Sequence, residues 1–457
     1  MERAIRITED IPVAHEADVA VIGGGPAGVG AALSAARLGL KVIVIEQANC
    51  LGGIATSGWH GHICIYSSWA RHDERVVGGI CHEMAERTVK RGYGAFDNQS
   101  FDFEVEPLKL ILEEMAAEAR VKVLYYTQFS TAVRSGGRIT SVIIQNKSGR
   151  QAVNARMFID CTGDADVAAR AGVGFDKGRP DDGRMQAMTL MFQIGGVDYD
   201  KVRAFRQGGG YKEKYGEDAE WWKLSGVWKE AQKNGDMEPF QDQIMGWWFT
   251  PTRPDQLGIN FTHIPRRDCT NAEDLTYATI EGRRQAFHLI NVYRKYIPGM
   301  EHCWLSHTAA IVGTRESRRI HGEYQIHEND LVAQKEFDDS IGYGSFFIDI
   351  HSCSGPGMDA ETWRPPQGFK YQIPYRALVP KGIDNLLVAG RCVSCTHKAL
   401  GSLRVMPQCV LEGEACGVAA REALSANVAP RGVDVKRVQA QLRTQGAIVF
   451  DKDIVRS

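Results

Sequence analysis

The sequence predicts an α/β fold in which a parallel β-sheet carries a nucleotide-binding turn, and three consecutive features indicate this class. Residues 19–22 form a short apolar run of the kind found in buried parallel strands. A glycine-rich turn follows at 23–28, and the segment after it has alanines at helical spacing. Residues 41–45 form a second apolar run, which ends at Glu46. Strand, glycine turn, helix and strand in this order are typical of a βαβ unit that binds a dinucleotide.

The glycines of the turn have the spacing G-x-G-x-x-G, and each has a physical task. Gly23 permits the tight turn, Gly25 lets the backbone approach a pyrophosphate, and Gly28 lets helix and strand pack closely. The N-terminus of the helix would offer unpaired N–H groups and a positive dipole end to phosphates. Glu46 ends the second strand, where a carboxylate can accept hydrogen bonds from an adenosine ribose. The sequence therefore predicts a bound dinucleotide.

Three further segments extend this pattern. Residues 50–58 continue the glycine-rich character just after Glu46 and can lie along an extended cofactor. Residues 157–166 have the character of a strand that runs into a turn of small residues. Residues 385–391 have the character of another strand, which ends in glycine.

Together these segments resemble the bacterial FAD-dependent oxidoreductase family, which has a glutathione-reductase-like FAD domain and is distantly related to fumarate reductase flavoproteins. The resemblance covers most of the chain. It rests on GGGPAG (23–28), LGG-x-AT (51–56), D-x-TGD-x-D (160–166), VGTRESRRIHGEY (312–324) and AGRCVSCTHKALGSLRVMPQC (389–409). The last two motifs are specific to this family, whereas the first occurs in nearly all FAD enzymes and many NAD enzymes.

The resemblance implies FAD as the cofactor and a set of residues that bind it. Gly23, Gly25 and Gly28 would hold the pyrophosphate, and Glu46 the adenosine ribose. Phe129 matches a position whose backbone meets the adenine. The other positions implied are Pro26, Ala27, Gln47, Gly52, Gly53, Ala55, Thr56, Cys161, Thr162, Gly163, Asp164, Gly390, Arg391 and Met406. Arg391 departs from the pattern, because many relatives in the wider superfamily have an acid there; its role is left open between pyrophosphate contact and another orientation.

The expected C-terminal helix, residues 408–424, follows Met406 and Pro407 and contains many small residues. In the family that the chain resembles, the N-terminus of this helix points at the pyrimidine end of the isoalloxazine. A positive dipole end there would stabilise negative charge on reduced flavin. The alternative is an ordinary packed terminal helix.

At 457 residues the chain is too long for one simple core, so we expect two domains. One is a discontinuous Rossmann-like FAD-binding domain of the glutathione-reductase type, residues 1–184 and 371–457. The other is an inserted α+β substrate domain, residues 185–370. Its composition differs, since five of the nine tryptophans fall between positions 221 and 248.

Within this plan, residues 107–120 and 273–296 have apolar side chains at helical spacing. Residues 121–126 and 139–145 alternate as strands do, with a glycine turn at 136–137 between them. No second nucleotide fingerprint is present, because the triple glycine at 208–210 leads into a polar segment. A separate NAD(P)H domain is therefore not expected.

Composition excludes several classes of function. The 54 basic and 56 acidic residues give a net charge of −2, which provides no field for nucleic acid. No apolar stretch is long enough for a membrane span. The N-terminus lacks a secretory signal, and the eleven cysteines lack a disulfide-scaffold spacing, so we expect a cytoplasmic protein. The pair Cys392 and Cys395 is either a redox dithiol or two small buried residues; no metal site is expected.

The candidate reacting groups lie near the expected flavin. His397 is predicted to transfer a proton, because its ordinary pKa is near neutrality; alternatively it only hydrogen-bonds the cofactor or backbone. Arg404 would hold an anionic substrate group or a flavin carbonyl, or else form a structural ion pair. Arg315 is placed on a helix, sharing a face with Arg319, and either faces the site or belongs to a solvated surface.

A second cluster, His60, His62 and Cys64, follows the flavin loop. It would line one flavin face or attach the flavin covalently; the alternative is local packing.

These residues predict an FAD-dependent oxidoreductase that transfers a hydride between a small polar organic substrate and flavin N5. The substrate would be anionic and held by arginines, and the electron acceptor is left open. One alternative is an NAD-binding enzyme of the thiazole-synthase type, and another is a flavin-bearing subunit without activity of its own. The oligomeric state is open as well, with a homo-oligomer as one alternative.

Overall fold

The computed structural model describes residues 5, 7–97, 99–216, 224–240 and 246–456. Its centre is a seven-stranded sheet with the order β7-β2-β1-β10-β9-β8, and β19 also pairs with β10. The strands are β1 (Val13–Ile22), β2 (Val42–Ile45), β7 (Lys122–Leu124), β8 (Gln128–Ser135), β9 (Arg138–Asn146), β10 (Gly149–Asp160) and β19 (Leu386–Val388). The mixed α/β fold with a Rossmann-like parallel core is the one that the sequence predicts.

The register of the parallel strands brings their carboxyl ends to one edge of the sheet. Ile22 pairs with Ile45 and with Asp160, and Asp160 pairs with Val388. The turns that follow β1, β2, β10 and β19 are therefore neighbours. Ligands of open α/β sheets bind at this edge.

Side chains of β1 alternate between the two faces of the sheet, as the period of a strand requires. Val19 and Val21 belong to the larger core, which also contains the buried faces of the helices on that side. Ala20 and Ile22 belong to the core on the opposite face. The continuous apolar run thus reflects a strand that is buried on both faces.

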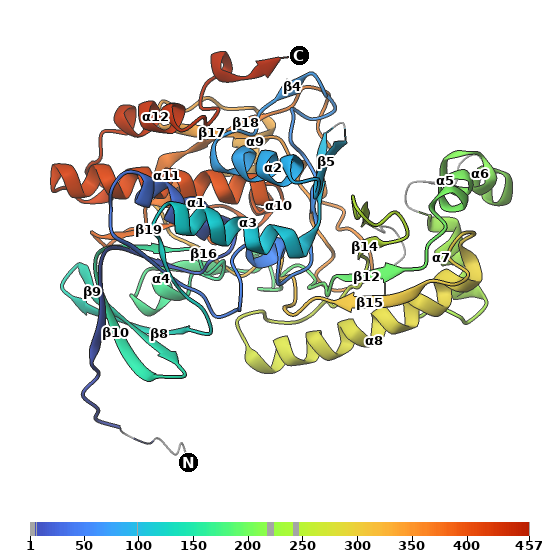
Figure 1. Cartoon of the computed structure of the whole chain (residues 1–457), viewed down its shortest axis with the longest axis horizontal. Coiled ribbons are helices and arrows are strands. Elements are labelled where there is room, and N and C mark those ends of the chain that lie inside the picture. Colours follow the sequence, from blue (N-terminus) through green and yellow to red (C-terminus); the bar gives the residue numbers. More distant parts are fainter. Residues whose placement is uncertain (1–4, 6, 98, 217–223, 241–245, 457) are drawn as a thin grey trace.

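Two helices from opposite ends of the chain lie against each other on one face of the sheet, α1 (Pro26–Arg37) and α11 (Met406–Ala426) (Figure 1). Their backbones approach closely. A Cβ on Gly413 would lie 1.9 Å from the carbonyl oxygen of Ala27, and one on Gly30 would lie 2.2 Å from that of Val410. Small residues on both helices therefore determine how near α11 comes to the nucleotide turn.

Further helices and short strands surround the seven-stranded sheet. The larger body also contains α2 (Gly79–Lys90), α3 (Val105–Glu118), α4 (Asp166–Arg170), α9 (Glu328–Val332), α10 (His397–Leu403), α12 (Val435–Thr444), η1 (Gly53–Ala55), η2 (Tyr375–Leu378), η3 (Pro430–Gly432) and η4 (Asp451–Asp453). Its short strands are β3 (His62–Ile63), β4 (Glu74–Arg75), β5 (Gly94–Asp97), β6 (Ser100–Phe103), β11 (Phe175–Lys177), β16 (Arg318–Ile320), β17 (Ser340–Gly344), β18 (Tyr371–Pro374) and β20 (Val455–Arg456).

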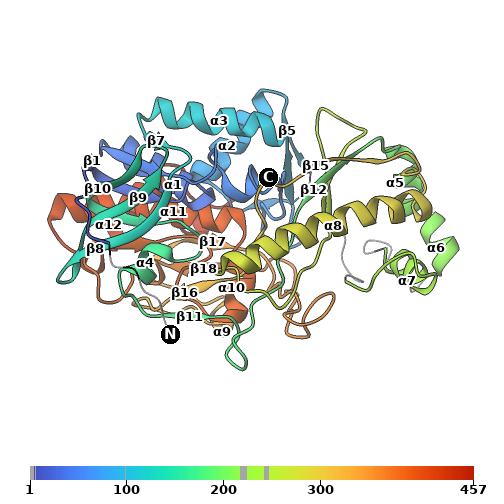
Figure 2. The same ribbon diagram turned by 90° about the horizontal axis from the view of Figure 1, so that it is seen from below.

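A four-stranded sheet with the order β13-β14-β12-β15 lies at one end of the molecule, together with α5 to α8 (Figures 1 and 2). Its strands are β12 (Phe192–Gly195), β13 (Gly246–Phe249), β14 (Leu257–Asn260) and β15 (Trp304–Thr308). The helices are α5 (Tyr199–Gln207), α6 (Gly210–Tyr215), α7 (Ser225–Lys233) and α8 (Ala272–Tyr296). The predicted domain boundaries at 184/185 and 370/371 stay predictions.

One element prediction is corrected in its bounds. The helix expected from Pro107 begins at Val105, because Pro107 still lies within the first turn, where a missing N–H is harmless. Trp221 and Trp222, two of the clustered tryptophans, lie outside the described residues. Among the residues that the structure describes, no helix is long and apolar enough to cross a membrane.

Candidate active site

A cavity of about 540 Å³ begins at the carboxyl edge of the parallel sheet and extends to the start of α11. At the sheet end it is lined by the turns after β1, β2 and β10. At the far end it is lined by the loops around Arg315, Asp349 and Arg404. An elongated cofactor and a small second molecule are the ligands that such a shape accommodates.

The glycine turn forms the first wall of the cavity. Gly23 has a φ of +98°, and a Cβ on it would lie 2.3 Å from the carbonyl oxygen of Cys161. A Cβ on Gly28 would lie 1.9 Å from the carbonyl oxygen of Gly23, so Gly28 serves helix–strand packing. Gly25 differs, since its missing Cβ faces open space, with the nearest atom 4.0 Å away. The open side of Gly25 is therefore the approach path for a ligand.

Glu46 closes the adenosine end that the sequence predicts. Its Oε2 accepts a hydrogen bond of 2.6 Å from the N–H of Gly24, and its Oε1 accepts one of 2.7 Å from that of Ala48. Burial raises the pKa of Glu46, while these backbone donors oppose that shift. Each carboxylate oxygen keeps a second lone pair, so the side chain can also accept a ribose hydroxyl.

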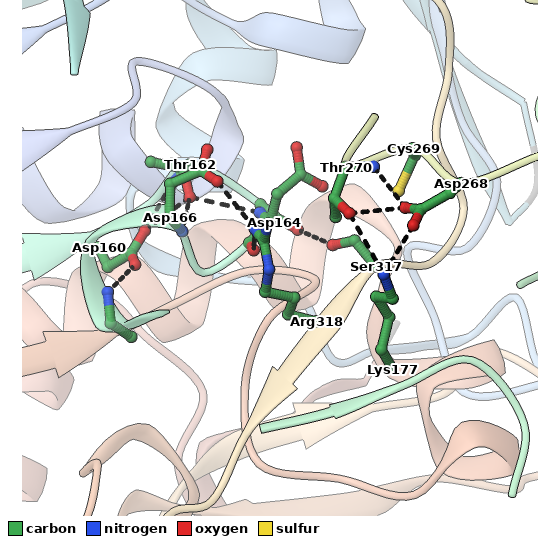
Figure 3. Close-up of polar contacts among 12 residues, drawn as sticks. Asp160, Thr162, Asp164, Asp166, Lys177, Asp268, Cys269, Thr270, Ser317 and Arg318 are labelled. Atoms are coloured by element: carbon green, nitrogen blue, oxygen red, sulfur yellow. Dashed lines mark hydrogen bonds and ion pairs between the residues drawn. The ribbon is translucent and has the colours of Figure 1, made fainter. Parts of the chain in front are cut away.

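The turn after β10 is held rigidly by its neighbours (Figure 3). Asp160 accepts hydrogen bonds from the N–H and hydroxyl of Thr162, at 3.1 and 2.7 Å. The hydroxyl of Ser317 donates to the carbonyl of Gly163 at 3.0 Å. Arg318 donates to the carbonyl of Asp164 and to the carboxylate of Asp166. Ser317, just before β16, and Arg318, its first residue, thus hold the small-residue turn in place.

The same view contains a second polar group beside this clamp (Figure 3). Lys177 donates to Asp268 at 2.6 Å, and Asp268 accepts the hydroxyl of Thr270. The thiol of Cys269 donates to the carbonyl of Glu316. These contacts link β11 to the loop that carries Arg315.

Arg391 supplies a cation to the cavity wall. Its Nη2 donates to Asp164 at 3.0 Å, whereas its buried Nη1 has no hydrogen-bond partner among the described residues. A buried guanidinium donor without a partner is costly, so an acceptor is expected there. The phosphate oxygens of a dinucleotide are such acceptors.

The residues present therefore fit FAD. The open side of Gly25 gives the backbone approach, and the unpaired Arg391 donor gives an anion partner. The N-terminus of α11, with Met406 and Pro407, opens on the same cavity. Its unpaired N–H groups and positive dipole end can stabilise negative charge.

The cavity brings together most of the residues that the sequence analysis selects. The lining residues among them are Gly23, Gly25, Pro26, Ala27, Glu46, Gln47, Gly53, Phe129, Cys161, Thr162, Gly163, Asp164, Arg315, Gly390, Arg391, Arg404 and Met406. Five of the selected residues do not line the cavity: Gly28, Gly52, Ala55, Thr56 and His397. Gly52 instead donates its N–H to the carbonyl of Gly24, and the hydroxyl of Thr56 donates to that of Leu51.

His397 lies away from the cavity wall, and this corrects its predicted position. It is the first residue of α10 and is buried. Its Nδ1 lies 2.8 Å from Oε1 of Glu316, which also accepts a hydrogen bond from Arg319. This contact is with a carboxylate side chain, not with the backbone, and the proton-transfer role of His397 stays a prediction.

Arg315 does line the cavity, although the helix predicted around it is wrong. The chain from 315 to 317 is irregular and leads into β16. Arg315 donates to the carbonyl of Ala187 at 2.6 Å, and its Nη2 lies 3.4 Å from Oδ1 of Asn260. No carboxylate among the described residues lies within ion-pair distance of Arg315.

Arg404 and Asp349 lie beside Arg315 at this end. Arg404 donates to the carboxylate of Asp349 at 2.8 Å, and its Nε has no hydrogen-bond partner among residues that the structure describes. Nε2 of His351 lies 3.4 Å from the same carboxylate, and its Nδ1 is likewise unpaired there. His60 completes this wall.

The electrostatics of this end favour an anion. Burial, and after it Arg404, lower the pKa of Arg315 to about 9, so it stays charged at neutral pH. Burial also lowers the pKa of His60 to about 3 and that of His351 to about 4. With neutral histidines, two guanidinium groups face one carboxylate. One buried positive charge therefore lacks a counterion.

The two cysteines of the C-x-x-C pair lie inside the fold. Cys392 and Cys395 are buried and free, which fits two small residues on a turn. No group of three or more His, Cys, Asp or Glu side chains within the described ranges is arranged to hold a metal ion.

Sequence reasoning missed Asp349, His351 and Asn260. Their only sequence signal is the D-x-H spacing of Asp349 and His351, which is common in loops.

The parallel sheet and this cavity have the architecture of a dinucleotide-binding protein. The chain belongs to the FAD dependent oxidoreductase family, whose model matches residues 18–442. It is an FAD-dependent oxidoreductase, and its cofactor is FAD. The bacterial origin and the distant relationship to fumarate reductase flavoproteins stay predictions.

Curated proteins match shorter parts of the chain. A dihydrolipoyl dehydrogenase of Manduca sexta is 28% identical over 175 residues, 37% of this chain and 33% of that protein. A thiamine thiazole synthase of Methanococcus aeolicus is 30% identical over 162 residues, 34% of this chain and 57% of that protein. The matched segments thus span less than two thirds of these relatives.

Among solved structures, a geranylgeranyl bacteriochlorophyll reductase-like protein from Thermoplasma acidophilum covers 94% of this chain and 83% of its own. It has 12% identity and a TM-score of 0.46.

Proposed function

We propose that this FAD-dependent oxidoreductase transfers a hydride between a small carboxylate-bearing substrate and N5 of its flavin. The observation that carries the proposal is the buried charge of Arg315, which has no carboxylate partner among the described residues. A substrate carboxylate would supply the missing counterion, and a planar guanidinium can bind it with two parallel hydrogen bonds. Bound FAD supplies the hydride-accepting or hydride-donating centre.

The neighbouring groups support orientation of the substrate. Arg404 is fixed by Asp349, which leaves its unpaired Nε as a second donor. Asn260 contacts Arg315 and limits the motion of its guanidinium. Holding the substrate in one pose lowers the entropic cost of the reaction.

His351 is the proton acceptor in this proposal. It lines the cavity, is neutral at pH 7, and has an unpaired Nδ1. After burial, Arg315 is the main group that lowers its pKa. A bound carboxylate would offset the charge of Arg315, so the pKa of His351 would rise toward the range of an effective base. This assignment replaces the proton-transfer role first predicted for His397.

The test is anaerobic reduction of the holoenzyme by a panel of 2-hydroxy acids and amino acids, followed by flavin absorbance. Arg315→Met should raise the concentration for half-maximal reduction by about 10- to 150-fold, the range for lost hydrogen bonds to a charged group. Arg315→Lys should recover part of the loss. Arg184→Met, at an exposed position, is the matched control.

Neutral analogues of the substrate test whether its carboxylate is needed for binding. Methyl esters of active acids should bind poorly to the original enzyme and should be insensitive to Arg315→Met. Esters that reduce the flavin as readily as the acids would overturn the proposal.

A further inference from the structure

One wall of the cavity carries two side chains that the proposed reaction does not use, His62 and Cys64, and Asp102 contacts His62. His62 lies on β3 and Asp102 lies directly opposite it on β6 in an antiparallel pair. Nδ1 of His62 is 2.5 Å from Oδ1 of Asp102. The carboxylate therefore fixes the imidazole ring and leaves Nε2 for another partner.

Cys64 is the cavity-lining residue next along the same side of this segment. It follows His62 by two residues, so both side chains lie on the same face of the extended segment. Both residues line the cavity, two positions apart on one extended segment. Burial lowers the pKa of His62, but Cys64 and Asp102 raise it well above its ordinary value. A protonated imidazole beside a thiol stabilises the thiolate.

Exposure separates Cys64 from the other cysteines. All eleven are described, and ten are buried, whereas Cys64 is partly exposed to the cavity. A structural cysteine gains nothing from a charged imidazole, while a nucleophile needs both the imidazole and an accessible sulfur. The unpaired Nδ1 of buried His351, in the same cavity, independently indicates that a polar ligand enters this space.

We propose that Cys64, His62 and Asp102 form a nucleophilic site that adds reversibly to the carbonyl carbon of an aldehyde or ketone that enters the flavin cavity. Cys64 is the nucleophile, His62 the proton donor, and Asp102 a positioning residue. The thiolate sulfur forms a bond to the carbonyl carbon, and the C=O π pair moves to the oxygen. The imidazolium of His62 gives that oxygen its proton. The product is a hemithioacetal, and the reverse step restores every group without an oxidant or reductant.

The carbonyl-addition site rests on the proposed function only for the identity of the substrate. With the substrate carboxylate bound to Arg315, the substrates that could also react with Cys64 are small oxo acids. Such acids carry both an anionic group and an electrophilic carbonyl carbon. The reactivity of Cys64 itself does not depend on the anion site, so the two can be tested separately.

The first experiment measures alkylation of the FAD-loaded enzyme by iodoacetamide at pH 6, with the modified cysteine mapped by mass spectrometry. An ordinary thiol of pKa ~8.5 is only ~0.3% thiolate at this pH. Beside the charged imidazole of His62, Cys64 should react roughly 10- to 100-fold faster than N-acetylcysteine.

Variants assign the roles. Asp102→Asn and His62→Gln should each slow labelling of Cys64 about tenfold or more and shift its pH profile upward, while flavin content and spectrum report that the fold is kept. Cys64→Ser should remove the label. Labelling of Cys64 at the rate of N-acetylcysteine, or a rate unchanged in both variants, would overturn the site.

The second experiment uses glyoxylate as the probe, because it is the smallest oxo acid. Glyoxylate should protect Cys64 from iodoacetamide saturably and reversibly. Glycolate has the same carboxylate without the carbonyl carbon and should protect at least tenfold less well. Equal protection by both would overturn carbonyl addition.

Arg315→Met separates this inference from the proposed function. It should weaken protection by glyoxylate but leave the labelling rate of free Cys64 unchanged. Unaltered protection in Arg315→Met, with glyoxylate still better than glycolate, would support the nucleophile and count against the anion site.

Discussion

Nδ1 of His397 lies 2.8 Å from Oε1 of Glu316, and both side chains are buried away from the cavity wall. Because Glu316 also accepts from Arg319, the histidine completes a buried polar network. Removing one member of such a network leaves the others without partners.

His397→Asn should therefore act on stability more than on chemistry. The variant should keep its flavin spectrum, reduce its flavin within about threefold of the original rate, and lose about 1–3 kcal/mol of unfolding free energy. Urea unfolding and stopped-flow reduction measure the two effects, and Glu316→Gln should resemble it. A fall of ~10²- to 10⁴-fold in the reduction rate, with intact flavin, would restore a proton-transfer role.

Gly25→Val should give folded, colourless protein. The missing Cβ of Gly25 faces open space, so a valine fits the chain itself but occupies the path of the pyrophosphate. Absorbance gives the flavin content, and circular dichroism gives the fold. Gly432→Val, at a site whose nearest neighbour is 3.6 Å away, is the control and should stay yellow. Full flavin loading of Gly25→Val would contradict this placement.

Gly413→Ala should damage the fold through a single methyl group. Its Cβ would lie 1.9 Å from the carbonyl oxygen of Ala27, a backbone atom that no side-chain rotation can move. Overpacking of this kind costs about 1–3 kcal/mol or more. Thermal unfolding should show the loss, and Gly432→Ala should show almost none. An unchanged melting temperature would mean that α1 and α11 are not held this closely.

Acid should destabilise the protein partly through His351. Its pKa falls from 6.5 to about 4 in the folded protein, so between these values the unfolded chain binds more protons. The contribution of neutral His351 to the free energy of unfolding is thus complete above pH 6.5 and is lost as the pH falls toward 4. His351→Gln should flatten the fall in unfolding free energy over this window, measured with urea at several pH values. Exposed His302→Gln is the control, and an equal slope in all three proteins would exclude His351 as the source.

The cofactor turn was predictable because its residues are contiguous. Gly23, Gly25 and Glu46 belong to one βαβ unit, and the spacing alone indicates their tasks. The fold class follows from the same unit, since a strand buried on both faces is apolar throughout.

The end of the cavity lined by Arg315, Asp349 and Arg404 was only partly predictable, because distant segments of the chain form it. Asp349 and His351 meet Arg315 and Arg404 through packing that no local pattern encodes. The charged run at 315–319 suggested a helix from its i,i+4 spacing. Arg319 instead pairs with Glu316 and with the carbonyls of Gly178 and Cys395, so tertiary contacts outweigh the helical periodicity.

The contact of α1 with α11 has a consequence for the order of events during synthesis. The glycine turn leaves the ribosome early, but the helix that packs on α1 and opens on the cavity begins only at Met406. Pairing of segments so distant along the chain has to await the later one. The cavity is therefore complete only once both the glycine turn and the start of α11 have been synthesised.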